Sequence, residues 1–155
     1  MAQQRKTPTD IDARYRTLLI LWFAQLTTIG FLFLFSRFFG PEVGSESLVP
    51  HRSLLIISLT ALGTVLAITS FTMKRKFLDR SVTEQKPELV QNALIVACAM
   101  CEVSALLGVL ERFLIGNRDY YLLFLIAAAG TAFHFPRREQ LLSATYKSSP
   151  GGSAI

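Results

Sequence analysis

Glu102 is the residue whose type and position point most clearly to chemistry in this sequence. It lies near the middle of an apolar stretch from Leu89 to Ile115, and an acidic side chain at membrane depth costs about 2.5–3.5 kcal/mol. A carboxyl group there can carry a proton when neutral, or bind a cation such as Na⁺ when ionised. It can equally donate a hydrogen bond to a neighbouring helix and so hold the two helices together. Glu102 is therefore predicted to be an ion-handling site or an interhelical contact.

Three threonines fall at about the same predicted depth as Glu102. Thr28 lies in the first apolar stretch, and Thr60 and Thr64 lie four residues apart in the second, so these two share one helical face. Their hydroxyl groups could supply ligands to a proton or Na⁺ held by Glu102. Threonine hydroxyls in membrane helices also bond to carbonyls of their own helix, so the structural interpretation of Glu102 stays open.

Small side chains surround Glu102 on its own predicted helix and also occur on the preceding one, where they would let helix backbones approach closely. These predicted packing residues are Cys98, Ala99, Ala105 and Gly63. Cys98 and Cys101 also form a C-x-x-C spacing, which marks redox sites in soluble domains. Inside a membrane helix nothing stabilises a thiolate, so we interpret both as small buried hydrophobic residues.

Four apolar stretches separate the charged segments of the chain. They are residues 17–39, 53–73, 89–115 and 120–136. The chain has 155 residues, of which 51% are hydrophobic, and a mean hydropathy of +0.40, which is too apolar for an ordinary soluble domain. At about 1.5 Å per residue, each stretch is long enough, or nearly so, to cross about 30 Å of hydrocarbon. We therefore predict an all-α bundle of four transmembrane helices over 17–136. A polar segment, 1–16, precedes it, and a tail, 137–155, forms a short interfacial helix and then becomes disordered.

The basic residues predict the orientation of this bundle. Twelve of the 16 lysines and arginines precede the first stretch, lie between the second and third, or follow the fourth, and four lie on the other side. By the positive-inside rule both termini are then cytoplasmic, in what we expect to be a bacterial inner membrane. The basic loop after Met73 would contact anionic lipid headgroups. Because the basic residues lie in the segments that flank the apolar stretches, the net charge of +5 does not indicate nucleic-acid binding.

The second and third stretches resemble a known hairpin. A polar loop with Gln85, Lys86 and Pro87 is followed by the segment Ala-Met-Cys-Glu102-Val-Ser-Ala-Leu-Leu-Gly. Over roughly residues 60–115 this is similar to the c-type proteolipid subunit of rotary ATP synthases. The resemblance implies that Glu102 is the ion-carrying carboxylate and that the loop faces a cytoplasmic stalk. The Gly-rich repeat of that family is absent, and the last stretch carries no acid, so the resemblance implies a c-like relative with a lost or changed role.

The remaining polar residues predict little chemistry. His51 and His134 fall on opposite faces of the predicted membrane, so we expect no metal site within one chain. His134 is expected to be interfacial, with contact to a pigment or haem as the alternative. Glu111 and Arg112 are expected to form an exposed or partly exposed pair at the outer interface, where long side chains can reach water.

The sequence contains none of the common catalytic or nucleotide-binding motifs, so we expect a protein that is not an enzyme and holds no cofactor. The first hypothesis is a small structural or accessory subunit of a membrane complex, with protein partners or a homo-oligomer in the membrane. The second is a c-like proteolipid that handles protons or Na⁺ through Glu102. The third is a pigment- or quinone-contacting subunit of an electron-transfer complex.

Overall fold

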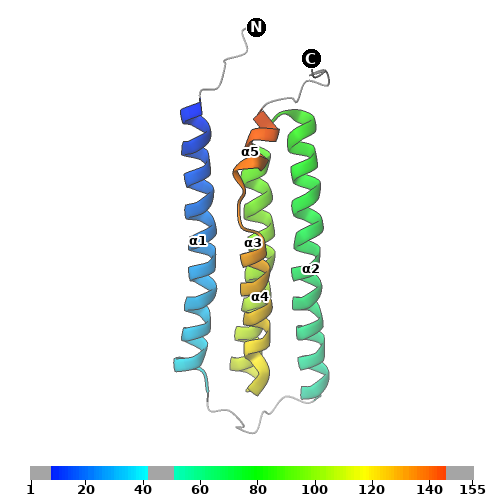
Figure 1. The fold of residues 1–155 in the computed structure, drawn as a ribbon. Coiled ribbons are helices and arrows are strands. Elements are labelled where there is room, and N and C mark those ends of the chain that lie inside the picture. The colour runs from blue at the N-terminus through cyan, green and yellow to red at the C-terminus, as the bar shows by residue number, and fades with distance from the viewer. Residues whose placement is uncertain (1–7, 42–50, 146–155) are drawn as a thin grey trace, which may run out of the picture.

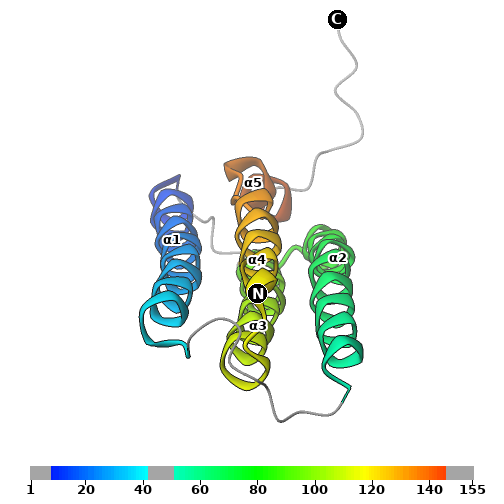
Figure 2. The same cartoon turned by 90° about the horizontal axis from the view of Figure 1, so that it is seen from below.

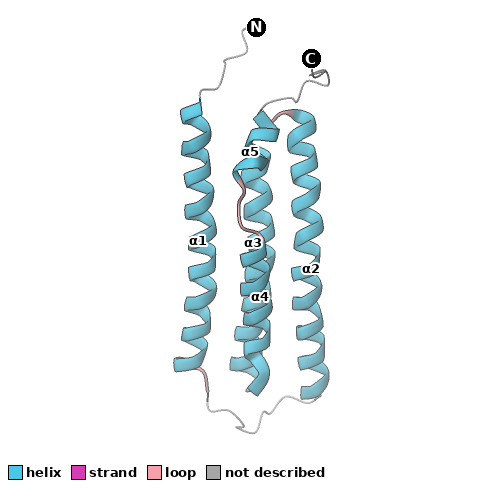
Figure 3. Cartoon of the chain, in the orientation of Figure 1, coloured by secondary structure: helices cyan, strands magenta, loops and turns pink. Residues whose placement is uncertain are grey.

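The computed structural model describes residues 8–41 and 51–145, and every regular element within them is helical (Figures 1 and 3). The elements are α1 (Pro8–Phe39), α2 (Arg52–Glu84), α3 (Glu88–Leu110), the π-helical turn η1 (Glu111–Ile115), the 3₁₀ turn η2 (Arg118–Tyr120), α4 (Tyr121–Phe133) and α5 (Arg138–Thr145). The all-α prediction is confirmed for these residues. The predicted disordered end of the tail, from Ser148, the last two residues of the helix predicted over 137–147, and residues 1–7 of the polar segment lie outside them.

Within residues 8–41 and 51–145, three helices are long and apolar enough to cross a membrane. They cover Ile11–Phe39, Arg52–Glu84 and Glu88–Ile115, and they are compatible with an integral membrane protein. The fourth predicted span is interrupted: α4 has 13 residues, or about 20 Å, and a non-helical segment separates it from α5. The count of four spans and the cytoplasmic placement of the termini therefore stay predictions.

The helices form an elongated bundle with α3 and α4 between α1 and α2 (Figures 1 and 2). α3 contacts α1, α2 and α4. Of the residues in the most apolar part of each helix, 50% are buried in α3 and 11% are buried in α1. The core therefore forms around α3, whereas α1 presents most of its apolar side chains to the surroundings, as a lipid-exposed helix would.

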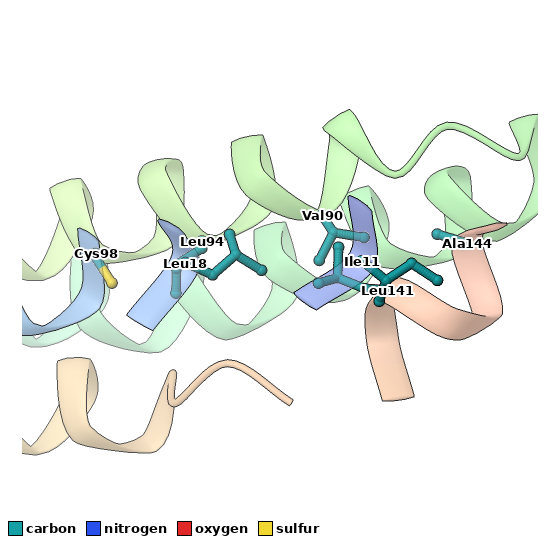
Figure 4. Packing of buried hydrophobic residues seen from close by; sticks show 7 residues of the cluster. All are labelled: Ile11, Leu18, Val90, Leu94, Cys98, Leu141 and Ala144. Carbon is teal, nitrogen blue, oxygen red and sulfur yellow. The ribbon is translucent and has the colours of Figure 1, made fainter. Parts of the chain in front are cut away.

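α5 closes the end of the bundle at which α1 begins (Figure 1). Its Leu141 and Ala144 are buried against Ile11 of α1 and Val90 of α3, in a hydrophobic cluster that also contains Leu18, Leu94 and Cys98 (Figure 4). An interfacial helix was predicted here, and a helix is present. Its apolar side packs on the bundle ends, because burying those side chains removes apolar surface from water.

The predicted loop residues make the tight connection between α2 and α3. Gln85 adopts a left-handed conformation with φ 52°, and the backbone N–H of Lys86 donates to the carbonyl of Ser81, which ends α2 in a Schellman-type turn. Lys86 pairs with Glu84 at 2.8 Å, and Pro87 precedes the first residue of α3. These residues therefore end one helix and start the next.

Candidate functional site

Glu102 lies on α3, where it is part-buried and contacts α1. We assign the side-chain amide of Gln25 on α1 so that its nitrogen, rather than its oxygen, faces the carboxyl group; it then donates to both carboxyl oxygens, to Oε2 at 2.9 Å. Gln25 lies three residues, about one helical turn, before Thr28, but the sequence alone does not show that α1 and α3 meet there. The pair links α1 to α3 across an otherwise apolar contact.

The three predicted threonine ligands do not gather around Glu102. Thr28 is exposed and donates to the carbonyl of Ala24 at 3.0 Å, and Thr64 donates to the carbonyl of Thr60 at 2.8 Å. Thr60 donates to a different acid, Glu111, at 2.9 Å. Two of the hydroxyls thus satisfy their own helix, in the way threonines commonly do, and the third bonds elsewhere.

Glu111 is buried, with 1% of its surface exposed, and so is Arg112, with 4%. The expectation of an exposed pair was therefore wrong. The Glu111 carboxylate accepts a hydrogen bond from Thr60 of α2 and another from the side-chain amide of Asn117, at 2.8 Å. Its backbone carbonyl accepts from the N–H of Asn117. The π-helical turn and the left-handed Gly116 (φ 64°) fold the chain back so that Asn117 can reach the acid.

Arg112 joins the end of α3 to the end of α1. Its guanidinium makes long contacts of 3.4 Å to the carbonyls of Ser36 and Gly40, and it lies 5.3 Å from the centre of the Tyr120 ring. The last carbonyls of a helix have no partner within the helix, and they attract cations. A Cβ at Gly40 would lie 2.5 Å from Arg112 Nε, so glycine there lets the guanidinium approach the backbone.

His134 is fully buried (0% exposed) at the end of α4, and its interfacial depth stays a prediction. Its Nε2 lies 2.8 Å from Ser70 Oγ. When the Ser70 hydroxyl donates to the carbonyl of Ala67, 2.6 Å away, the matching tautomer of His134 carries its proton on Nε2 and donates to Ser70. Lys74 donates to the carbonyl of His134 at 2.9 Å. The ring packs against Phe71 and is fully buried, so a pigment or haem could reach either ring nitrogen only by displacing side chains of this chain.

The predicted packing residues divide into two groups. Cys98 and Ala105 are buried in two separate apolar clusters, and Gly63 is buried where α2 meets α3 and α4. Ala99 is only part-buried. Cys98 and Cys101 are both buried free thiols, and among the residues that the structure describes, no group of three or more histidine, cysteine or acidic side chains could hold a metal ion.

An apolar groove of about 440 Å³ lies between α1 and α4. Its lining residues are Leu26, Ile29, Gly30, Phe33, Tyr121, Phe124, Leu125 and Ala128. Nothing lies within 4 Å of the position that a Cβ of Gly30 would take, so the missing side chain leaves part of the space open. Sequence reasoning missed this groove, because it depends on how two helices separated along the chain pack together.

No known protein family, curated protein or solved structure matches the chain.

The contact between Gln25 and Glu102 predicts a measurable coupling. In a double-mutant cycle of Gln25→Ala and Glu102→Ala, we expect an interaction free energy of about 0.6–1.7 kcal/mol, the range for interhelical hydrogen bonds in membranes. Reversible unfolding in mixed detergent micelles would measure it. Thr27 is the matched control, because it bonds only to its own helix, at Phe23. The changes in unfolding free energy caused by Thr27→Ala and Glu102→Ala should add to within about 0.5 kcal/mol. If the changes for Gln25→Ala and Glu102→Ala also simply add, the pairing is contradicted.

Proposed function

We propose that this chain is a non-catalytic integral membrane protein that acts as a structural or accessory subunit of a membrane complex. The observation that carries this proposal is the pairing of Glu102 with Gln25. The acid at the centre of the most buried transmembrane-length helix joins two helices. None of the three predicted threonine hydroxyls, of Thr28, Thr60 and Thr64, bonds to it.

The other buried polar side chains support the same interpretation. Thr60 and Glu111 join α2 to the turn after α3, Ser70 and His134 join α2 to the end of α4, and Arg112 contacts the end of α1. In an apolar environment, each such contact fixes one helix relative to another. A small bundle held in this way offers a rigid apolar surface to a larger partner.

The surface of α1 supports a role in packing within the membrane. Its exposed aromatic side chains are Phe23, Phe31, Phe35, Phe38 and Phe39. In water such a surface would be an aggregation site, whereas in a bilayer it is covered by lipid chains or by another helix. We propose that protein partners or further copies of the chain cover part of it.

We also propose four crossings, with both termini in the cytoplasm of a bacterial cell and the basic residues against anionic headgroups. The fourth crossing would consist of α4 and the segment that follows it. Irregular backbone is tolerated at membrane depth only where protein covers it. The burial of His134 and Pro136 and the bond from Lys74 to the His134 carbonyl support this arrangement.

A second candidate function is the handling of protons or Na⁺ by Glu102, as the resemblance to c-type proteolipids implies. It is favoured by one observation: the carboxyl group is part-buried rather than sealed, at the middle of a 28-residue apolar span. An ion arriving from the membrane side of α3 could therefore reach it.

Two measurements test the proposed function. The tagged chain, purified in mild detergent, should retain a partner at fixed stoichiometry, and a chain that purifies alone or as a symmetric ring would contradict the accessory role. Carbodiimide labelling of Glu102, followed by mass spectrometry across pH, separates the second candidate. We expect labelling that Na⁺ does not change, with the unlabelled Glu102→Gln variant as control. Protection of Glu102 by Na⁺ would instead support the ion-handling function.

A further inference from the structure

One face of α3 remains uncovered along the middle of the bundle. Ile95, Ala99, Glu102 and Leu106 follow one another at spacings of four, three and four residues, so they lie on the same side of the helix. Ile95 is 38% exposed and Leu106 is 47% exposed, and Ala99 and Glu102 are part-exposed between them. Val103 and Leu110, each 42% exposed, extend the uncovered surface beside and beyond this row, whereas other sides of α3 contact α1, α2 and α4.

The carboxyl group on this face has a neutral partner and no cation. Gln25 donates to both oxygens of Glu102, and the ion pairs that the structure shows among its described residues involve Glu84 and Asp12 instead. Each carboxylate oxygen can accept a further hydrogen bond. Acidic side chains at membrane depth are characteristically paired with basic ones, and an amide does not neutralise the charge. An ionised Glu102 therefore has hydrogen-bond donors from Gln25 but no countercharge among the described residues.

We infer that this face of α3 binds a transmembrane helix of a partner protein that presents one lysine or arginine at the depth of Glu102. This inference rests on the proposed accessory function and states the chemistry of the partner. Ala99, one turn before the acid, leaves space for a second helix to approach closely, and Gln25 holds the carboxyl group in place before the partner binds.

Charge complementarity favours such a partner over a second copy of this chain. The three span-length apolar stretches contain no lysine or arginine between residues 17 and 36, 53 and 73, or 89 and 111. A second copy would thus bring another carboxyl group to the same depth, and two ionised carboxyl groups repel each other. A cation on the partner supplies the countercharge for Glu102. The attraction between the two charges also offsets the free energy cost of removing the cation from water.

The test uses the full chain, reconstituted in lipid vesicles with a donor fluorophore on a C-terminal tag. The probes are acceptor-labelled leucine–alanine transmembrane peptides of one length. One carries a lysine at its centre, one carries leucine there, and one carries the lysine two helical turns away. We expect energy transfer with the central-lysine peptide at an apparent affinity at least tenfold above the other two. Glu102→Gln should abolish that preference, whereas Glu84→Gln, which removes an acid at the polar end of α2, should not.

A second pair of variants checks the face itself. Leu106→Trp, which places bulk one turn from Glu102, should weaken binding of the lysine peptide several-fold. Ile20→Trp, on an exposed position of α1 (69% exposed), should leave it unchanged. Equal binding of the three peptides to the wild-type chain, or transfer between two labelled copies that excludes the peptide, would overturn the inference. Neither outcome depends on co-purification of a native partner, so the proposed function and this inference can fail separately.

Discussion

Replacing Glu111 with alanine is expected to lower the free energy of unfolding by about 3 kcal/mol. The carboxylate is the acceptor for the hydroxyl of Thr60 and for the side-chain amide of Asn117. Asn117 is buried (6% exposed), so its side-chain amide would lose its acceptor without gaining water, and the part-buried Thr60 would lose its contact with the turn after α3. The removed side chain also leaves a cavity, because Glu111 is 1% exposed. Unfolding of the purified protein in mixed detergent micelles would measure the loss.

The control for this prediction is an acid of the same chain without buried partners. Asp79 is exposed on the polar end of α2, and Asp79→Ala should change the free energy of unfolding by no more than about 0.5 kcal/mol. The double variant Thr60→Val/Glu111→Leu removes a donor together with its acceptor, and we expect it to be less destabilised than Glu111→Ala. A loss of under about 1 kcal/mol for Glu111→Ala would show that the carboxylate is not part of the internal network.

Replacing Gly63 with valine is expected to lower the free energy of unfolding by about 3 kcal/mol, at the upper end for overpacking a core. A Cβ at this position would lie 2.5 Å from Cδ2 of Leu123 and 2.9 Å from Oγ of Ser104. Valine adds two further carbons, so α2 would have to move away from both α3 and α4. The adjacent bond between Thr60 and Glu111 would be strained by the same movement.

Gly30 on α1 is the matched control, because it is a glycine in the middle of an apolar helix with nothing within 4 Å of its Cβ position. Gly30→Ala should leave stability unchanged or raise it by up to about 1 kcal/mol, the difference in helix propensity between the two residues. Thermal unfolding of both variants beside the wild type would compare them. Equal losses at Gly63 and Gly30 would mean that helix propensity, rather than the close approach of α2 to α4, determines the effect.

The sequence by itself determined that this is an all-helical chain with apolar segments of membrane-spanning length. Runs of apolar residues of this length can satisfy their backbone in a bilayer only as helices. It also predicted a short helix after the last apolar stretch, where the structure has α5 (Arg138–Thr145). It did not show that α4 stops after 13 residues, because the apolar composition continues across the interruption at His134–Pro136.

Only the tertiary structure decided which polar groups meet. Spacing along a helix predicts the depth and face of a side chain, but it does not predict which neighbouring helix lies opposite. Thr60 was therefore assigned to Glu102 by depth, whereas it bonds to Glu111, and Gln25 is the residue that reaches Glu102. Glu111 and Arg112 were expected near water because they are charged and close to a helix end. The π-helical turn and Gly116 bury them instead, by folding Asn117 back over the acid, and no local pattern of residue types encodes that contact.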